Sequence, residues 1–262
     1  MKHEESKKIE NLWIQAQKKL EDSINSYVKG KFRSGRKSSG TTYAQEAFGK
    51  YYPQEAYPYS LAIDSYTATM DDLYDDTKAS NEERKMNVLA TNSQVIKMLS
   101  WPEALRKEAI LHAKKMSEIG IKEEIIAEQL KNTDDETLAI ELSKECYFTR
   151  AKVMDFAVRI PCYFLSLPCE KVKIVEEAGR SFRALILLEK DIKDVEHDIL
   201  HGTETPVTIF LKKGFDVDRL RSAISTYSLE NLEKIVEVSD DKIVKYVAKN
   251  FYGMCKDIYR YV

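Results

Sequence analysis

The scarcity of glycine and proline is the feature that most constrains the fold of this chain, because these two residues end helices and shape turns. Nine glycines and six prolines occur among 262 residues, well below average usage. No Asn-Gly or Asp-Gly pair, the strongest short hairpin signal, is present. Apolar residues instead recur three and four positions apart, as in the stretch 5–28 at Ile9, Leu12, Trp13, Ala16, Leu20 and Ile24. The sequence therefore predicts an all-α fold, a helical bundle with short connections.

Length, charge and cysteine content narrow the setting further. The chain is long enough to bury a sizeable core, and we expect one domain spanning residues 1–262. It has no run of about 18 apolar residues, so no transmembrane segment is expected. The N-terminus lacks a signal-peptide core, and the four cysteines form no CxxC pair, so a cytoplasmic protein is expected. The net charge of −2 argues against a nucleic-acid partner.

The stretch MDDLYDDTKASNEERK (70–85) crowds four aspartates into six residues. On a helix Asp71 shares a face with Asp75, and Asp72 with Asp76, and each like-charge pair costs an isolated helix about 0.2–0.5 kcal/mol. A divalent cation would reverse that cost, because Mg²⁺ takes carboxylate oxygens and bridges them to phosphates. The stretch therefore indicates a metal site, with a solvated acidic helix turn as the alternative.

A second acidic cluster follows an apolar stripe later in the chain. Asp191, Asp194 and Asp198 are spaced three and four apart and so share one helical face, which continues backward to Leu187 and Leu188. The same face of the helix would be buried in its apolar turns and would carry ionised carboxylates in the next turns. Such a face fits a helix that lines a cavity. We expect this helix and the first acidic helix to face each other across the cavity and hold metal ions around a diphosphate.

The two clusters resemble the two aspartate-rich motifs of the trans-isoprenyl diphosphate synthases. Asp71, Asp72 and Asp75 match the family's DDxxD, and DIKDVEHD (191–198) is similar to its second motif. Further landmarks follow in the same order along the chain. They are the basic, glycine-containing loop VKGKFRSGRKSSG (28–40), the pair Arg84-Lys85, and Lys152 in RAKVMDF.

The resemblance implies a fold, a reaction and partners. The fold is an antiparallel helical bundle of the isoprenoid synthase type around a central cavity, in a homodimer or, alternatively, a heteromer. The reaction is the Mg²⁺-dependent condensation of an allylic diphosphate with isopentenyl diphosphate, with about three Mg²⁺ ions at the site. The developing charge on the leaving diphosphate is stabilised by metals and nearby cations.

The resemblance also assigns roles to single residues. The metal ligands would be Asp71, Asp72, Asp75, Asp191, Asp194 and Asp198. The allylic diphosphate would contact Lys152 and Arg84, and the isopentenyl diphosphate would bind Lys31, Arg33 and Arg36. Tyr66 lies about 7 Å before the first motif at 1.5 Å per helical residue. Its ring would form the floor of the cavity and limit the product to about C15 to C20.

Three departures from the family pattern keep other functions open. Lys190 stands where the second motif has its first aspartate, Val153 follows Lys152 in place of threonine, and Arg84 comes late. One alternative is a class I terpene synthase, a cyclase that acts on one allylic diphosphate. Lys190, Asp194 and Asp198 have its ligand spacing, and Arg260 precedes a tyrosine as in those enzymes. A second alternative is a non-catalytic subunit of a heteromeric synthase.

Overall fold

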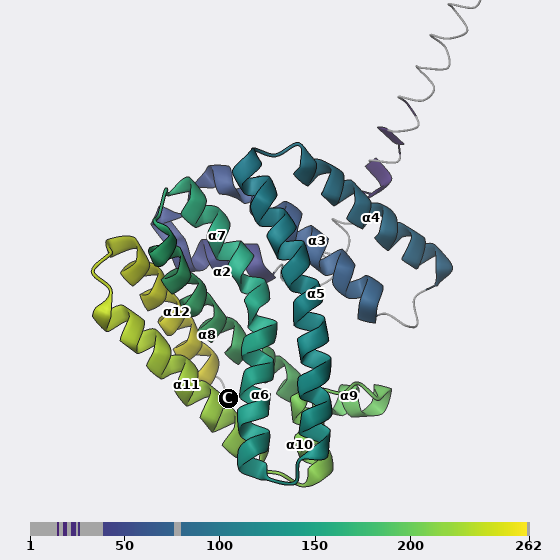
Figure 1. The fold of residues 1–262 in the computed structure, drawn as a ribbon, viewed down its shortest axis with the longest axis vertical. Helices are drawn as coiled ribbons and strands as arrows, with labels where there is room; N and C mark the ends of the chain where they lie inside the picture. The colour runs from purple at the N-terminus through teal and green to yellow at the C-terminus, as the bar shows by residue number, and fades with distance from the viewer. Residues whose placement is uncertain are drawn as a thin grey trace, which may run out of the picture. The chain divides into compact units, whose positions relative to one another are not determined.

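A computed structural model describes residues 39–75 and 80–260, together with scattered positions between residues 15 and 26. Figure 1 shows an assembly of helices, and no strand occurs among the described residues. The helices are α2 (Ser39–Phe48), α3 (Tyr57–Asp75), α4 (Asn81–Leu99), α5 (Glu103–Asn132), α6 (Glu136–Arg150), α7 (Met154–Phe164), α8 (Cys169–Lys193), α9 (Val195–His201), α10 (Pro206–Lys213), α11 (Val217–Val238) and α12 (Lys242–Arg260). Short 3-10 turns lie at η1 (Gly49–Tyr51), η2 (Gln54–Ala56) and η3 (Ala151–Val153). The all-α prediction is confirmed for this part of the chain.

The contacts divide the chain into two compact units. The first unit comprises Met1–Thr42 and Pro58–Lys107, and the second comprises Tyr43–Tyr57 and Glu108–Val262. The single domain, the isoprenoid synthase type of bundle and its central cavity stay predictions. Within the described part of the chain, every helix is too short or too polar to cross a membrane.

The starts of α3 and α4 follow signals that are visible in the sequence. α3 begins at Tyr57, with Pro58 in its first turn, where a missing backbone N–H costs no helical hydrogen bond. Ser80 caps α4 in a reciprocal arrangement. The Glu83 N–H donates to the Ser80 hydroxyl at 3.2 Å, and the Ser80 N–H donates to the Glu83 carboxylate at 2.9 Å. Both signals act within a few residues of the helix start.

α8 is the central helix of the second unit, because α6, α7, α10, α11 and α12 all pack against it. Its Leu185 and Leu188 are fully buried. Gly179 allows α7 to approach closely, since a Cβ at this position would lie 3.3 Å from Cγ of Met154. Side chains near the end of α8 are therefore carried by a helix that its neighbours hold on several sides.

The cysteines are free thiols. Cys146, Cys162 and Cys255 are buried, as expected for reduced core residues, whereas Cys169 is exposed at the start of α8. Burial raises the pKa of Cys146 to about 12, and it raises the pKa of Cys255 to about the same value. These buried thiols are therefore inert at neutral pH, and Cys169 is the exposed thiol among the described residues.

We expect Gly49→Ala to destabilise the protein by about 2 kcal/mol, because it combines two penalties. Gly49 has φ of 49°, and a Cβ there would lie 2.7 Å from the Tyr246 hydroxyl oxygen. Gly214→Ala is the matched control, because Gly214 has φ of 73° with no atom within 4 Å of the added Cβ. Urea unfolding measures both variants. Equal losses of stability would show that the contact with Tyr246 has no cost.

Candidate functional site

The second acidic motif spans the junction of two helices, and not one continuous helix as predicted. α8 ends at Lys193 and α9 begins at Val195, with Asp194 between them at φ −92° and ψ 4°. In Figure 1 α9 projects from the side of the second unit. Asp191 is buried, whereas Asp194 and Asp198 are partly exposed. The three carboxylates therefore occupy different environments, and only Asp191 belongs to the core.

Asp191 is held by two side chains of α6. The Tyr147 hydroxyl donates to Oδ2 of Asp191 at 2.9 Å, and the Arg150 guanidinium donates to the same oxygen at 2.8 Å. Arg150 also pairs with Glu123 of α5, with 3.2 Å between Nε and the carboxylate. One face of the Asp191 carboxylate is thus occupied, and Oδ1 has no hydrogen-bond partner among the described side chains.

Arg150 links the two carboxylates of this cluster. Its guanidinium pairs with both Asp191 and Glu123. Burial, with Asp191 beside it, raises the pKa of Tyr147 well above its ordinary value, so the phenol stays protonated and donates. Burial alone would lower the pKa of Arg150, but Asp191 and Glu123 outweigh it and raise the pKa.

Lys152 in η3 has cationic neighbours that are themselves paired, Lys122 with Glu145 and Arg180 with Asp155. Its side chain is partly buried, and no ion pair or hydrogen bond joins its ammonium to another residue of the described chain. Burial lowers the pKa of Lys152, and the neighbouring charges of Lys122 and Arg180 lower it further. Repulsion of this kind is relieved when an anion binds between the cations, so the surroundings of Lys152 suit a phosphate or diphosphate.

A buried ion network lies next to Lys152 between α7 and α8. Asp155 accepts hydrogen bonds from Arg180 at 2.5 and 2.7 Å and from Lys115 at 3.0 Å. Glu176 pairs with Arg159 and, at 3.4 Å, with Arg180. Burial raises the pKa of Glu176 despite these partners. Both carboxylates are almost fully buried, and a buried carboxylate is costly unless it is paired with a cation.

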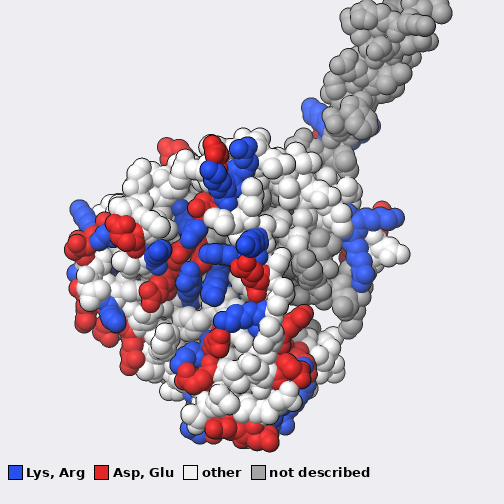
Figure 2. Space-filling view, in the orientation of Figure 1, with Lys and Arg blue, Asp and Glu red and all other residues white. Residues whose placement is uncertain are grey.

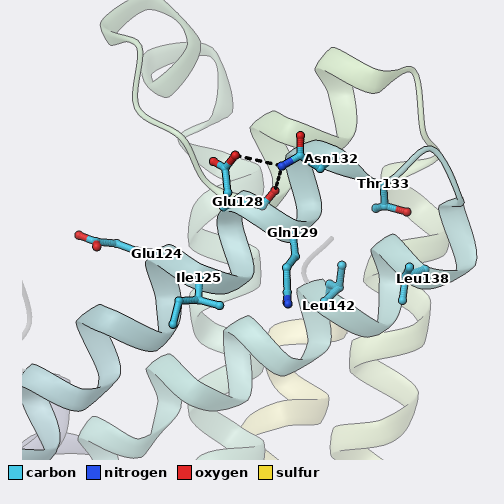
Figure 3. Close-up of a pocket in the computed structure, with 8 residues that line it drawn as sticks. All are labelled: Glu124, Ile125, Glu128, Gln129, Asn132, Thr133, Leu138 and Leu142. Carbon is cyan, nitrogen blue, oxygen red and sulfur yellow. Dashed lines mark hydrogen bonds between the residues drawn. The ribbon is translucent and has the colours of Figure 1, made fainter.

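Figure 2 shows basic and acidic side chains interleaved over the region where α6 and α7 lie in Figure 1. An open groove of about 800 Å³ lies elsewhere, along α5 and α6 and the loop that joins them (Figure 3). Its lining residues are Glu124, Ile125, Glu128, Gln129, Asn132, Thr133, Leu138 and Leu142. This set contains two carboxylates and no cation, so the groove does not suit a diphosphate.

Several predicted site residues belong to the first unit. Tyr66 is buried on α3, and Arg84 is exposed in the first turn of α4. Asp71, Asp72 and Asp75 lie in the last turns of α3, but their side chains are outside the described residues. The basic residues Lys31, Arg33 and Arg36 are also outside them, as are most of the stretch 5–28 and the side chain of Arg260. The roles assigned to these residues stay predictions.

The second motif offers the type of ligand that Mg²⁺ prefers, but not a complete set of ligands. Carboxylate oxygens are the ligands that Mg²⁺ takes, and Asp191, Asp194 and Asp198 supply them. Among the residues whose side chains are described, however, no three His, Cys, Asp or Glu side chains gather into a metal-binding group. A complete Mg²⁺ site would therefore need further oxygen ligands, such as those of a bound diphosphate.

Sequence reasoning missed the residues that surround the predicted ones. Tyr147 and Arg150 stand three apart on α6, and that spacing on a helix places both on one face. Arg180 and Lys122 come from α8 and α5, so nothing local links them to Lys152. Only the tertiary structure brings these cations together.

Comparisons with known proteins identify no relative. No protein-family model matches the chain, no curated protein matches it, and no solved structure matches it.

Proposed function

We propose that the chain is a Mg²⁺-dependent prenyltransferase that condenses an allylic diphosphate with isopentenyl diphosphate. The single observation that carries the proposal is Lys152, a partly buried ammonium without an ion-pair partner in the described chain, with Lys122 and Arg180 close by. Such an arrangement suits a polyanion of high charge density. The two aspartate-rich motifs, at the ends of α3 and α8, supply the ligand type that accompanies diphosphates in proteins.

Each residue has a defined task in this proposal. Lys152 would bind the allylic diphosphate and stabilise the negative charge that develops when its carbon–oxygen bond breaks. Asp191, fixed by Arg150 and Tyr147, would turn its second oxygen toward a cation. Bound Mg²⁺ would supply Lewis-acid stabilisation of the leaving diphosphate. The allylic carbon would then bond to isopentenyl diphosphate, which loses a proton. Buried Tyr66 would limit the product to about C15 to C20.

The first test is a binding measurement that needs no turnover. Calorimetry of the full chain with inorganic diphosphate and Mg²⁺ is expected to show binding, and Lys152→Gln is expected to weaken it at least about tenfold, since a charge-assisted contact is lost. Lys114→Gln is the matched control, because Lys114 is an exposed lysine on α5 whose side chain keeps 74% of its exposure. Equal affinity of the two variants would remove Lys152 from the site.

The second test identifies the reaction. The purified chain is incubated with Mg²⁺ and C5, C10, C15 or C20 allylic diphosphates, with and without isopentenyl diphosphate, and products are analysed by mass spectrometry. A longer diphosphate that appears only with isopentenyl diphosphate is expected. A hydrocarbon or alcohol from one allylic diphosphate alone would indicate a terpene synthase. Diphosphate binding without any product would indicate a non-catalytic subunit.

A further inference from the structure

α9 carries two histidines on one face, within and just beyond the second acidic motif. His197 and His201 are four residues apart, the spacing that makes two residues neighbours on the surface of a helix. Their rings are stacked, with 4.1 Å between the centroids and 26° between the ring planes. Both residues are exposed, and 72% of the His197 side chain is accessible. The two imidazoles therefore lie side by side on the surface of the second unit.

One hydrogen bond fixes the tautomer of His201. Its Nδ1 lies 2.8 Å from the backbone carbonyl oxygen of His197. A carbonyl oxygen only accepts hydrogen bonds, so Nδ1 of His201 must carry the proton that is donated. In the neutral ring the lone pair is then on Nε2, the nitrogen that remains free to bind a metal ion. Histidines that bind metals commonly donate their other N–H to a backbone carbonyl, because this bond fixes the orientation of the ring.

The separation of the two rings suits one metal ion shared between them. A Zn²⁺–nitrogen bond is about 2.0–2.1 Å long, so two such bonds span up to about 4.2 Å. The ring centroids are 4.1 Å apart, and rotation about the side-chain torsions of these exposed residues can bring one nitrogen of each ring within that span. Imidazole binds ions such as Zn²⁺, Ni²⁺ and Cu²⁺, whereas Mg²⁺ takes oxygen ligands. The pair therefore suits a transition-metal ion and not Mg²⁺.

The pair supplies two ligands to such an ion. Asp198 lies beside it, with 3.8 Å between Oδ1 of Asp198 and Nδ1 of His197. Where the structure describes side chains, however, no group of three His, Cys, Asp or Glu residues is placed to hold a metal ion. Water would therefore occupy the other positions around the ion, as it does in zinc sites that keep an open position.

We propose that His197 and His201 bind a divalent transition-metal ion such as Zn²⁺ through one nitrogen of each ring, which is Nε2 in His201. Histidines four residues apart on a helix hold Zn²⁺ in the same way in the metalloproteases that carry an HExxH motif. The site differs in its ligands from the Mg²⁺ site proposed for the aspartates. It does not depend on the reaction that the chain performs.

Calorimetry of the full chain with Zn²⁺ is the first test. The protein carries no affinity tag, excess Mg²⁺ occupies sites made of oxygen ligands, and Cys169→Ser removes the exposed thiol, which is itself a zinc ligand. Zn²⁺ is expected to bind this background protein. Adding His201→Gln is expected to weaken the binding at least about tenfold, because one of the two protein ligands is lost. A background protein that binds no Zn²⁺, or an unchanged affinity in His201→Gln, would overturn the proposal.

A rearranged variant separates the spacing of the histidines from their number. His201→Gln combined with Ile199→His keeps two histidines on α9 but places them two residues apart, where they do not face each other. This variant is expected to bind Zn²⁺ as weakly as His201→Gln alone. Glu196→Gln, at an exposed position of the same helix, is the matched control and is expected to keep the affinity of the background protein. Full affinity in the rearranged variant would show that the pair is not the site.

Chemical modification locates the bound ion. Diethyl pyrocarbonate modifies exposed imidazoles, and mass spectrometry of the digested protein measures the extent of modification at each histidine. Zn²⁺ is expected to slow the modification of both His197 and His201, whereas Mg²⁺ is expected to leave it unchanged. Modification of the two histidines at the same rate with and without Zn²⁺ would place the ion elsewhere and contradict the proposed site.

Discussion

Arg150→Met is expected to lower the free energy of unfolding by about 3–5 kcal/mol, the cost of leaving a buried charge without its partner. Arg150 pairs with both Asp191 and Glu123, and it donates to Asp191 at 2.8 Å. Without it, Asp191 keeps the Tyr147 hydroxyl, which offsets only part of the cost of burying a carboxylate. Urea unfolding at neutral pH measures the loss.

Two further variants distinguish this effect from a general loss of packing. Adding Asp191→Asn to Arg150→Met is expected to restore part of the stability, because the unpaired charge is then gone, and the double-mutant cycle gives the coupling energy. Arg219→Met is the control at an ion pair with Glu136, where 56% of the arginine side chain is exposed. It is expected to cost less than about 1 kcal/mol. Equal losses at Arg150 and Arg219 would mean that Asp191 needs no cation.

The stability of the protein is expected to fall in mild acid because of His112. This imidazole is 3% exposed and lies against the Phe156 ring, with 4.8 Å between ring centroids. Burial lowers its pKa from 6.5 to about 4, although Asp155 opposes the shift and Lys115 adds to it. Below pH 6.5 the unfolded chain therefore binds a proton at His112 that the folded chain does not bind. The stabilisation is fully present above pH 6.5 and is lost as the pH falls to about 4.

The loss attributable to His112 is up to about 3 kcal/mol across this interval, at 1.36 kcal/mol per pKa unit. His112→Gln keeps a polar side chain of similar size but cannot titrate. We expect the parent protein to lose more stability than His112→Gln between pH 7 and pH 4.5, as measured by urea unfolding. Carboxylates titrate in both proteins, so the difference between the two curves isolates His112. Parallel curves would contradict a neutral buried imidazole.

The lower levels of structure could be predicted from the sequence. Helices are indicated by the scarcity of glycine and proline and by apolar residues three and four positions apart. These signals involve only residues that are close in sequence. The cap at Ser80 and the helix start at Pro58 are local for the same reason. The burial of Asp191 was also foreseeable, since the apolar stripe through Leu187 and Leu188 leads directly to it.

The partners of the candidate site could not be predicted in this way. Asp191 meets Arg150 and Tyr147 across more than 40 residues of sequence, and Lys152 gains its cationic neighbours from α5 and α8. The break at Asp194 was missed because Asp191, Asp194 and Asp198 keep helical spacing through it. The spacing of residues predicts which of them share a face if a helix continues. It does not predict whether the helix continues.

α4 shows most clearly what the local sequence determines and what only the tertiary contacts determine. Its sequence alone determines a helix with a stripe of Val, Leu and Ile side chains, since capping and spacing are local properties. The usual expectation turns that stripe inward. The tertiary structure decides otherwise, because Thr91 bonds to Thr69 of α3 and the polar face is thereby buried. Which face of a helix is buried depends on what the neighbouring helix offers, and a neighbour with hydroxyl groups to satisfy can outweigh an apolar stripe.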